Sequence, residues 1–568
     1  MRDVAVPRSS LGFAAAQGRR PHRHRRDRRE TDPGSSSWAN WFETAVGRFD
    51  IEHPQEDLTI PQRLIARACA EPDAVAYRQK RHGYYQEWAW RRLALDVAGM
   101  ESALRGLGFR RGARAALIGD PCLELLVIEL AVLALGGIAV ALYPSHPPAE
   151  LAALLRDCDP TIIAVDTQEQ RDKLLDAPGG VSAARPIILI NGRGKTPSPQ
   201  ANTLDYEHLR QTGAQSYAAN PEAFMESVRR GDADDPALIL YTGFSSGHPT
   251  GAVHSQRTYH HTLRAMPILC PTLLKRRLRG VAALPMAHAV GRITVFLPLA
   301  SRLIVHFPEG AESLRTVFRE VAPSFAFYVP RIFQKMASAL LSDLRSTRGL
   351  KRTAYRGAMY FADRARGRTR GGATQWAVRL GYRVAQAIVF RPLLKKAGLA
   401  RLGYAATGGA PVPQELVSLL WRWGLDLREI YVQAECGVVL AQQASPSAAD
   451  SIGALSRIGT IAAEISESGE IVVQTPGLAI GRWEGGQVSR RTGDAGYRTG
   501  DIASEAQGRL RLLGNAAQFV TLHGGLKINR QRIASTLIGS NYISEAIVLV
   551  RESGAVLSLL ELEFEAIS

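Results

Sequence analysis

A loop of small polar residues follows an apolar run near the middle of the chain. Residues 237–256 read ALILYTGFSSGHPTGAVHSQ, which is an apolar strand followed by Gly, Ser, Thr and Pro, with a helical pattern after it. Glycine lets backbone N–H groups point toward a bound phosphate, and hydroxyl groups donate further hydrogen bonds. Surface turns share this composition, so the loop alone is consistent with either a phosphate-binding loop or an ordinary surface turn.

Five further segments carry polar side chains in a fixed order along the chain. They read ALPMAHAVG (283–291), PSFAFYVPRIFQKM (323–336), TGGAP (407–411), YVQAECG (431–437) and YRTGD (497–501). Each also has an ordinary interpretation: His288 as a core histidine, Glu435 as a surface charge and 497–501 as a polar turn. Six such segments in order make chance a poor explanation of the set.

The order and spacing of these segments resemble the acyl-adenylate-forming (AMP-binding) ligases, most nearly the long-chain fatty acid–CoA ligases. The first loop is similar to the family's phosphate loop, Y-T-S-G-T-T-G-x-P-K-G, and Ser245 and Ser246 stand for its two threonines. The positions that match it are Tyr241, Thr242, Gly247, Pro249 and Gly251. The resemblance extends over about residues 38–568.

The resemblance implies roles for the matching residues. The implied catalytic residues are Thr242, His288 and Glu435. The implied nucleotide-binding residues are Ser245, Ser246, Gly247, Gly408, Gly409, Ala410, Pro411, Tyr431 and Asp501. Tyr431 would stack on adenine, Glu435 would hold Mg²⁺ and Asp501 would bind the ribose hydroxyls, which suits carboxylate oxygens. ATP, Mg²⁺ and coenzyme A are the implied cofactors and co-substrates, and His288 would lie beside the substrate carboxylate.

Several positions depart from the family pattern. Thr250 replaces the lysine of the phosphate loop, Gly243-Phe244 replaces Ser-Gly, and Ala434 replaces a threonine that bonds the AMP phosphate. Residues 514–518, GNAAQ, stand where the family has G-R-x-K-D. Each lost donor that faces the phosphates in the transition state would cost about 10²–10³ in rate.

The end of the chain departs from the family as well. The last lysine is Lys527 and the chain ends at Ser568, before the position of the family's catalytic lysine. We therefore expect a truncated C-terminal domain. The expected domains are a disordered basic tail at 1–36, an AMP-binding adenylation domain at 37–513 and a partial C-terminal domain at 514–568.

Three interpretations of function stay open. The leading one is ATP-dependent activation of a medium- or long-chain fatty acid, through an acyl-adenylate, to its acyl-CoA thioester. The second is an impaired family member that binds an acyl chain or nucleotide without turnover, and the third is a specialised activity such as thioester formation from a supplied adenylate. The V-P-R segment and the basic insertion before 407–411 favour fatty acids over aromatic acids or amino acids.

Short apolar runs alternate with helical patterns through the region that holds these segments. Such alternation implies an α/β protein with helix-flanked parallel sheets, here followed by a short α+β C-terminal domain. Residues 130–142 are too short to span a bilayer and predict a buried helix, a glycine turn and a core strand. The other predicted helices are 63–70, 90–107 and 149–157. The other predicted strands are 74–77, 113–119, 161–165, 187–190, 237–241, 280–284, 303–306, 546–550 and 558–564.

The positive charge is concentrated in two places. The net charge is +17; residues 1–30 hold nine arginines, and residues 345–401 hold fifteen Lys or Arg against Asp363 alone. Basic stretches bind nucleic acids or anionic membranes. No interleaved aromatic platform supports nucleic-acid binding. Because a fatty acid would be delivered from a membrane, we expect loose peripheral contact with a membrane. The sequence does not indicate an oligomeric state.

Cysteine usage points to the cytoplasm. The five cysteines are scattered and form no CxxC pair, which argues against a disulfide framework and a zinc site. The N-terminus shows no apolar segment followed by a cleavage site, so no secretory signal is visible. We expect a cytoplasmic protein, with a peripheral position at the inner face of the membrane as the alternative.

Overall fold

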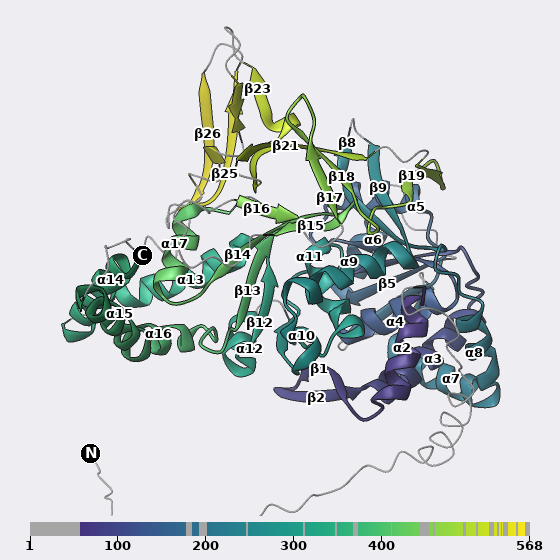
Figure 1. Cartoon of the computed structure of the whole chain (residues 1–568). Helices are drawn as coiled ribbons and strands as arrows, with labels where there is room; N and C mark the ends of the chain where they lie inside the picture. The colour runs from purple at the N-terminus through teal and green to yellow at the C-terminus, as the bar shows by residue number, and fades with distance from the viewer. Residues whose placement is uncertain are drawn as a thin grey trace, which may run out of the picture. The chain divides into compact units, whose positions relative to one another are not determined.

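The computed structural model describes residues 57–562 except for 178–184, 192–201, 246–247, 311–312, 347–348, 367–372, 411, 442–453, 458–460, 492–495, 507–508, 522–526, 531–532, 535–536, 538–542 and 552–554. The tail predicted at 1–36 lies outside the described residues. Helices and strands alternate through most of the remainder (Figure 1). The predicted α/β class is confirmed.

The first large sheet carries the phosphate-loop segment. In the order of hydrogen-bonded neighbours, its described strands are β20 (Gln487–Arg490), β19 (Gly481–Glu484), β9 (His248–Ser255), β8 (Pro236–Ser245), β4 (Ile138–Leu142), β3 (Arg114–Ile118), β5 (Ile162–Thr167), β6 (Ile187–Asn191) and β7 (Thr203–Asp205). The strands from β8 to β7 pair in parallel, whereas β8–β9, β9–β19 and β19–β20 pair antiparallel. The sheet is therefore mixed, and part of it has the predicted parallel order.

Burial explains the elements in the middle of this sheet. Every residue of helix α4 (Leu123–Ala134) and of strand β4 is buried, as expected for a helix that is apolar on all sides and a central parallel strand. Gly136, at φ +69°, makes the turn between them. The helix, glycine turn and strand predicted for 130–142 are confirmed. The other helices of this part are α2 (Ile60–Ala70), α3 (Trp90–Gly106), α5 (Pro148–Cys158), α6 (Gln168–Leu175), α7 (Tyr206–Ala219) and α8 (Pro221–Arg229).

The segment predicted as an open loop after β8 is largely a hairpin. Strand β8 extends to Ser245, β9 begins at His248, and Gly243 pairs with Thr250 across the two strands. The sequence prediction was wrong here because it counted small polar residues as loop, whereas their backbones pair as strands. Gly251 leaves room in this pairing, since a Cβ there would lie 2.6 Å from the Ile239 side chain.

A second large sheet holds the later segments. Its described strands, in order of neighbours, are β12 (Phe325–Tyr328), β13 (Tyr404–Gly408), β14 (Leu427–Gln433), β15 (Gly437–Ala441), β16 (Ala454–Arg457), β22 (Arg509–Asn515), β21 (Tyr497–Ala506), β18 (Glu470–Gln474) and β17 (Ala462–Ile465). Strands β12, β13 and β14 are parallel, and β14–β15 and the pairs beyond it are antiparallel. A smaller sheet has the order β10 (Arg279–Val281), β11 (Ile304–Phe307), β1 (Val75–Arg81) and β2 (Tyr84–Ala89).

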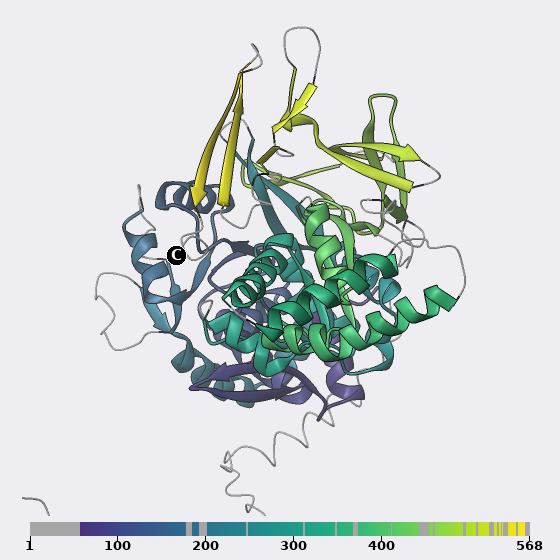
Figure 2. The same cartoon turned by 90° about the vertical axis from the view of Figure 1, so that its left-hand side faces the viewer.

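A helical layer accompanies the first strands of the second sheet. Its core joins Phe333 of α13 (Pro330–Arg345), Phe390 and Leu394 to Leu420 of α17 (Gln414–Arg422). Figures 1 and 2 show helices α14 (Leu350–Arg366), α15 (Ala373–Ala385) and α16 (Arg391–Lys396) next to α13 and α17. A π-helical turn, η3 (Gln386–Phe390), joins α15 to α16. The remaining helices of this part are α9 (Gln256–Leu269), α10 (Thr272–Lys275), α11 (Ala289–Phe296), η1 (Leu297–Ala300) and α12 (Leu314–Val321).

The last part of the chain forms short two-stranded sheets. Strand β23 (Phe519–Thr521) pairs with β24 (Lys527–Asn529), and β25 (Ile543–Val550) pairs with β26 (Val556–Leu562). The predicted strands at 546–550 and 558–564 correspond to β25 and β26. Strand β22 crosses residue 513, and the domain boundary proposed there stays a prediction. None of the helices in the described ranges is long and apolar enough to cross a membrane.

Candidate active site

One cavity of about 490 Å³ brings together side chains from both large sheets. It lies at the carboxyl ends of strands β4, β13 and β14, beside Tyr241 and Thr242 of β8, and such sheet ends commonly bind ligands in α/β proteins. Its lining residues are Tyr143, His146, Glu150, Leu154, Tyr241, Thr242, Ala287, His288, Ala289, Gly409, Val432, Gln433, Ala434 and Glu435. Four of the predicted site residues, Thr242, His288, Gly409 and Glu435, therefore line one cavity.

His288 begins helix α11 and is positioned by its own helix. The backbone N–H of Val290 donates to Nδ1 of His288 at 3.1 Å. Burial lowers the pKa of His288, so the ring is neutral near pH 7. Because Nδ1 accepts this hydrogen bond, we assign the proton to Nε2, which can donate to an acidic substrate.

Gly409 lets the loop after β13 approach His288. It has φ +79°, and a Cβ there would lie 3.1 Å from Cε1 of His288. Any other residue would be strained at this φ and would crowd the imidazole. The 283–291 and 407–411 segments thus meet in space, as the motif order requires.

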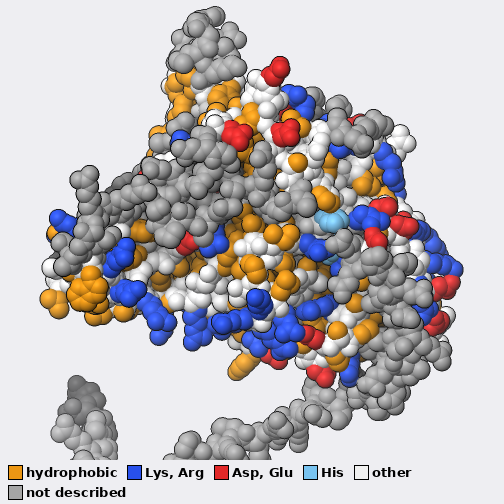
Figure 3. Space-filling view, viewed as in Figure 1, with side chains coloured by type: hydrophobic (Ala, Val, Ile, Leu, Met, Phe, Trp, Pro, Cys, Tyr) orange, Lys and Arg blue, Asp and Glu red, His pale blue; other side chains and the backbone are white. Residues whose placement is uncertain are grey.

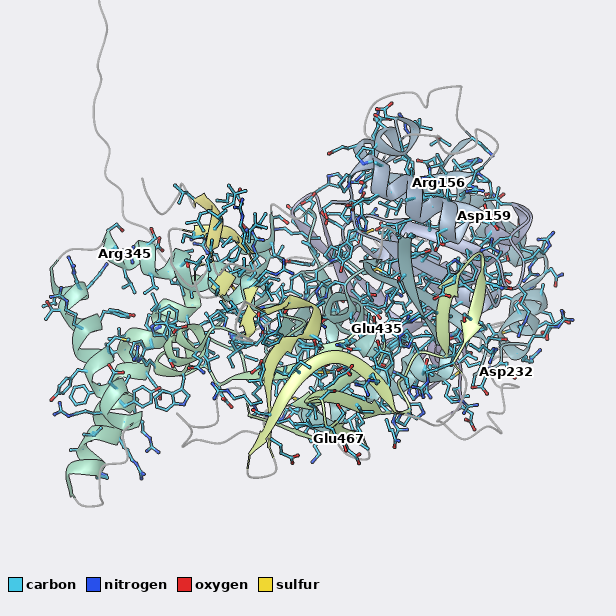
Figure 4. The ribbon with its side chains drawn as sticks, turned by 90° about the horizontal axis from the view of Figure 1, so that it is seen from above. Arg156, Asp159, Asp232, Arg345, Glu435 and Glu467 are labelled. Atoms are coloured by element: carbon cyan, nitrogen blue, oxygen red, sulfur yellow. The ribbon has the colours of Figure 1, made fainter. Side chains whose placement is uncertain are left out.

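Two hydrogen bonds fix the backbone that carries Glu435. His254 of β9 donates from Nε2 to the carbonyl oxygen of Ala434 at 2.6 Å. The N–H of Ala479 donates to the carbonyl oxygen of Glu435 at 2.7 Å. Burial lowers the pKa of His254 to about 4, so it is neutral, and its Nδ1 accepts from Oγ1 of Thr258. Seen from above, Glu435 lies near the middle of the view, whereas Arg345 lies far to one side at the end of α13 (Figure 4).

Tyr431 and Asp501 meet beside the cavity and do not line it. The Tyr431 hydroxyl donates to Oδ2 of Asp501 at 2.7 Å, and the amide of Gln433 donates to the same oxygen at 2.6 Å. The amide of Asn515 donates to Oδ1 at 2.9 Å. Burial raises the pKa of Tyr431 well above its ordinary value, so the phenol stays protonated and donates. Since Gln433 lines the cavity, it connects Asp501 to that space.

The structure places the remaining predicted residues as follows. Ser245 is the last residue of β8, Gly408 is the last residue of β13, and Ala410 follows at the end of that strand without lining the cavity. A Cβ at Gly408 would lie 2.3 Å from the carbonyl oxygen of Ile430, so this strand needs glycine there. Ser246, Gly247 and Pro411 lie outside the described residues.

Sequence reasoning missed the cavity wall made by the start of α5. The imidazole Nδ1 of His146 lies 3.2 Å from Oε2 of Glu150, and the ring packs edge-on against Tyr143 with centroids 5.5 Å apart. The signal was present, because Tyr143 follows a central parallel strand at its carboxyl end. By contrast, His254 gave no such signal, because its partner Ala434 is 180 residues away in sequence.

Comparison with known proteins now decides the family. The family model described as "AMP-binding enzyme" matches residues 65–483. The chain belongs to the AMP-binding enzyme family. The chain is also similar to the long-chain-fatty-acid–CoA ligase FadD15 of Mycobacterium bovis, with 24% identity over 507 residues, 87% of this chain and 80% of that protein.

Solved structures of this AMP-binding fold agree with the architecture. The A domain of carboxylic acid reductase from Segniliparus rugosus, in complex with AMP and a co-purified carboxylic acid, has a TM-score of 0.64. It is 16% identical, and the match covers 94% of this chain and 86% of that chain. The anthranilate CoA ligase AuaEII has a TM-score of 0.62 at 16% identity, covering 90% of this chain and 87% of that one. Both likenesses show the fold.

The described lining of this cavity carries acids and histidines but no side chain with a permanent positive charge. Glu150 and Glu435 face it with His146 and His288, and no Lys or Arg occurs among its described lining residues. Thr250, at the position of the family's lysine, lies on β9 opposite Gly243. The described residues include no group of three or more His, Cys, Asp or Glu that could hold a metal. Mg²⁺ needs no such group when one or two carboxylates and nucleotide phosphates bind it, so Glu435 fits this ion.

Proposed function

We propose that this AMP-binding enzyme activates a medium- or long-chain carboxylic acid through an acyl-adenylate to its CoA thioester. The observation that carries the proposal is the convergence of Thr242, His288, Gly409 and Glu435 on one cavity. Similarity to the fatty-acid ligase FadD15 over 87% of the chain supports an aliphatic acid. Assays with acids of several lengths, and with an aromatic acid, would define the substrate.

The residues divide the work of adenylation. We assign Thr242, Ser245, Ser246 and Gly247 to the phosphates, and Asp501 with Gln433 to the ribose. Tyr431 and the loop 408–411 would hold the adenine. The Nε2–H of His288 would donate to the substrate carboxylate and orient it toward the α-phosphate. The carboxylate oxygen bonds to that phosphorus as pyrophosphate leaves, and the CoA thiolate later displaces AMP.

Mg²⁺ would supply the positive charge that the described lining lacks. When bound, it neutralises charge on the phosphate oxygens in the transition state. Glu435 is the residue we propose as its ligand, and the hydrogen bonds to the carbonyl oxygens of Ala434 and Glu435 fix the backbone that carries it. Glu150, which also lines the cavity, offers a second acidic group.

A second candidate is binding without turnover. Thr250 and Ala434 stand where the family has a lysine and a threonine, and three hydrogen bonds already occupy Asp501. A chain with these features could hold nucleotide and acyl chain while adenylation stays slow. The two candidates differ in a rate that can be measured.

The test is fatty-acid-dependent ATP–pyrophosphate exchange on the full chain, followed by acyl-CoA formation. Exchange by the native chain supports the ligase. Thr250→Lys restores the missing charge beside the phosphates and should raise exchange by about 10²-fold, whereas Thr212→Lys on α7 should not. Absence of exchange in both the native chain and Thr250→Lys, with ATP binding retained, would favour binding without turnover.

We also propose loose contact with a membrane, because medium- and long-chain acids partition there. The cytoplasmic face of a membrane carries anionic lipid, which attracts basic proteins. The positive charge of the chain, +17 in total, suits such contact. Flotation of the full chain with lipid vesicles tests this part separately from catalysis.

A further inference from the structure

We infer that helices α14, α15 and α16 form the surface that contacts a membrane with anionic headgroups. The described residues 350–365 and 376–396 make up this surface, which we call the α14–α16 face. The inference deepens the membrane contact of the proposed function by naming the residues that make it. It does not depend on turnover, so its failure and failure of the ligase proposal give different results.

An apolar stripe runs along the outer side of α15 and η3. Trp376, Leu380, Val384 and Ile388 recur at every fourth residue and are all exposed. Side chains at this spacing lie on one side of a helix. Trp376 is 68% exposed and Ile388 is 70% exposed, which is unusual for residues of this size. Large apolar side chains exposed together on one side of a helix indicate an interaction site.

The inner side of the same helix already has its partners. The Tyr382 hydroxyl donates to the backbone carbonyl oxygens of Trp421 and Arg422 at 3.0 and 3.2 Å. Ala385 and Phe390 are buried in the core that includes Leu420. The stripe therefore faces away from the packing that holds α15 in the fold.

Cations flank the stripe. Residues 349–396 contain twelve Lys or Arg, and Asp363 is the only acid among them. Asp363 pairs with Arg422 of α17 at 2.7 Å, so it does not offset the charge of the outer side. Arg379 and Arg383 are exposed between the apolar residues of α15, and Arg364 lies 4.2 Å over the ring of Tyr360. Figure 3 shows blue and orange side chains together at the left-hand end, over α14–α16.

A lipid surface suits this face better than the other occupants. Apolar residues with tryptophan, flanked by Lys and Arg, are typical of helices that lie in the headgroup region. A second copy would bring two strongly positive faces together, and the N-terminal residues 1–30, with nine arginines, carry the same sign. Charge complementarity therefore selects an anionic partner, and the tryptophan stripe selects one with an apolar interior.

The experiment is flotation of the full chain with vesicles of phosphatidylcholine, with and without phosphatidylglycerol. Binding should require phosphatidylglycerol and weaken as salt rises, because screening shortens the range of attraction. Arg379→Gln with Arg383→Gln should bind about 30-fold more weakly, from the ~1 kcal/mol that each arginine contributes near an anionic surface. Arg490→Gln with Arg491→Gln removes the same charge from exposed sites on and after β20 and should bind as the native chain does.

Two further measurements separate lipid insertion from other binding. Tryptophan emission of the native chain should shift to shorter wavelength on vesicles, and the shift should be lost in Trp376→Phe. Ile388→Asp should also release the chain from vesicles, while thermal unfolding shows that it folds. Unchanged vesicle binding by Ile388→Asp and by the α15 arginine variant would assign the contact to another surface. Equally strong binding to soluble polyglutamate, without a shift in tryptophan emission, would assign the α14–α16 face to an acidic protein partner. Either result overturns the inference.

Discussion

The hydrogen bonds of Asp501 show how much room this carboxylate has for a ribose. An ionised carboxylate offers about four lone-pair sites, and Tyr431, Gln433 and Asn515 occupy three of them. Asn515 stands where the family motif has arginine, and here its amide donates to the carboxylate. One ribose hydroxyl can therefore join without rearrangement, and a second requires one of these donors to move.

Asp501→Ala should weaken nucleotide binding by about 10- to 100-fold, because hydrogen bonds to a charged acceptor contribute ~1.5–3 kcal/mol each. It also leaves the Tyr431 hydroxyl and two amides without their acceptor, so thermal stability should fall as well. Isothermal titration with AMP measures the first effect. Glu467→Ala, at an exposed carboxylate, is the control. Unchanged AMP affinity in Asp501→Ala would remove this residue from the site.

The contact between Gly409 and His288 can be tested by comparison with another glycine that has a positive φ but no neighbouring atoms near its Cβ position. Gly409→Ala adds strain at φ +79° and places a Cβ 3.1 Å from the His288 ring, whereas Gly485→Ala, at φ +60°, meets nothing within 4 Å. Both should lose about 1–2 kcal/mol of stability from the left-handed backbone. Only Gly409→Ala should also raise KM for the carboxylic acid substrate, because it displaces the imidazole. Equal kinetics in the two variants would contradict the contact.

Helices α4 and α11 are joined by a buried ion pair that supports the His288 segment. Arg292 pairs with Glu129, both side chains are almost wholly buried, and Nε of Arg292 donates to the carbonyl oxygen of Met286 at 2.9 Å. Burial raises the pKa of Glu129, and Arg292 opposes that shift. The pair thus ties the start of α11, and with it His288, to the core of the first sheet.

Arg292→Met should destabilise the fold by about 3–5 kcal/mol, because it leaves Glu129 buried without a partner. The double variant Glu129→Leu with Arg292→Met should recover most of this loss. Because the pKa of Glu129 is raised in the folded state, the free energy of unfolding is highest below the pKa of Glu in the unfolded chain, about 4.3. It falls as the pH rises above that value. Urea unfolding of Arg292→Met should therefore show a larger deficit at pH 7 than at pH 4. A deficit independent of pH would point to lost packing instead.

Elements with a local sequence signal could be predicted, whereas those set by contacts between distant residues could not. The apolar runs at 113–119 and 130–142 identified β3, α4 and β4, because continuous burial leaves a local signal. The motif residues Thr242, His288 and Glu435 came with the family resemblance. The hairpin β8–β9 was missed because small polar residues look alike in loops and paired strands. His254, Gln433 and the wall at His146 were missed because contacts made only after folding set their roles.

The molecule as a whole is positive, yet the cavity is not. The net charge is +17, but the described lining offers two carboxylates, two histidines and no Lys or Arg. The basic residues are concentrated instead in residues 1–30 and 345–401, and the second of these stretches includes the α14–α16 face. Charge there can attract a membrane or an anionic ligand from a distance. If the cavity binds a polyphosphate as proposed, its described lining leaves backbone N–H groups and the proposed Mg²⁺ as the sources of attraction.

Removal of Mg²⁺ should therefore weaken ATP binding far more than AMP binding. With EDTA, the triphosphate meets Glu150 and Glu435 without compensation, and affinity for ATP should fall by about tenfold or more, since ~1.4 kcal/mol of repulsion suffices for that factor. AMP, which carries one phosphate, should lose much less. Titration of both nucleotides with and without Mg²⁺ measures the difference, and Glu435→Gln should reduce the effect of Mg²⁺ on ATP while sparing AMP. ATP affinity that stays the same in EDTA would show that a cation from outside the described lining reaches the phosphates, and Glu435 would lose its proposed role.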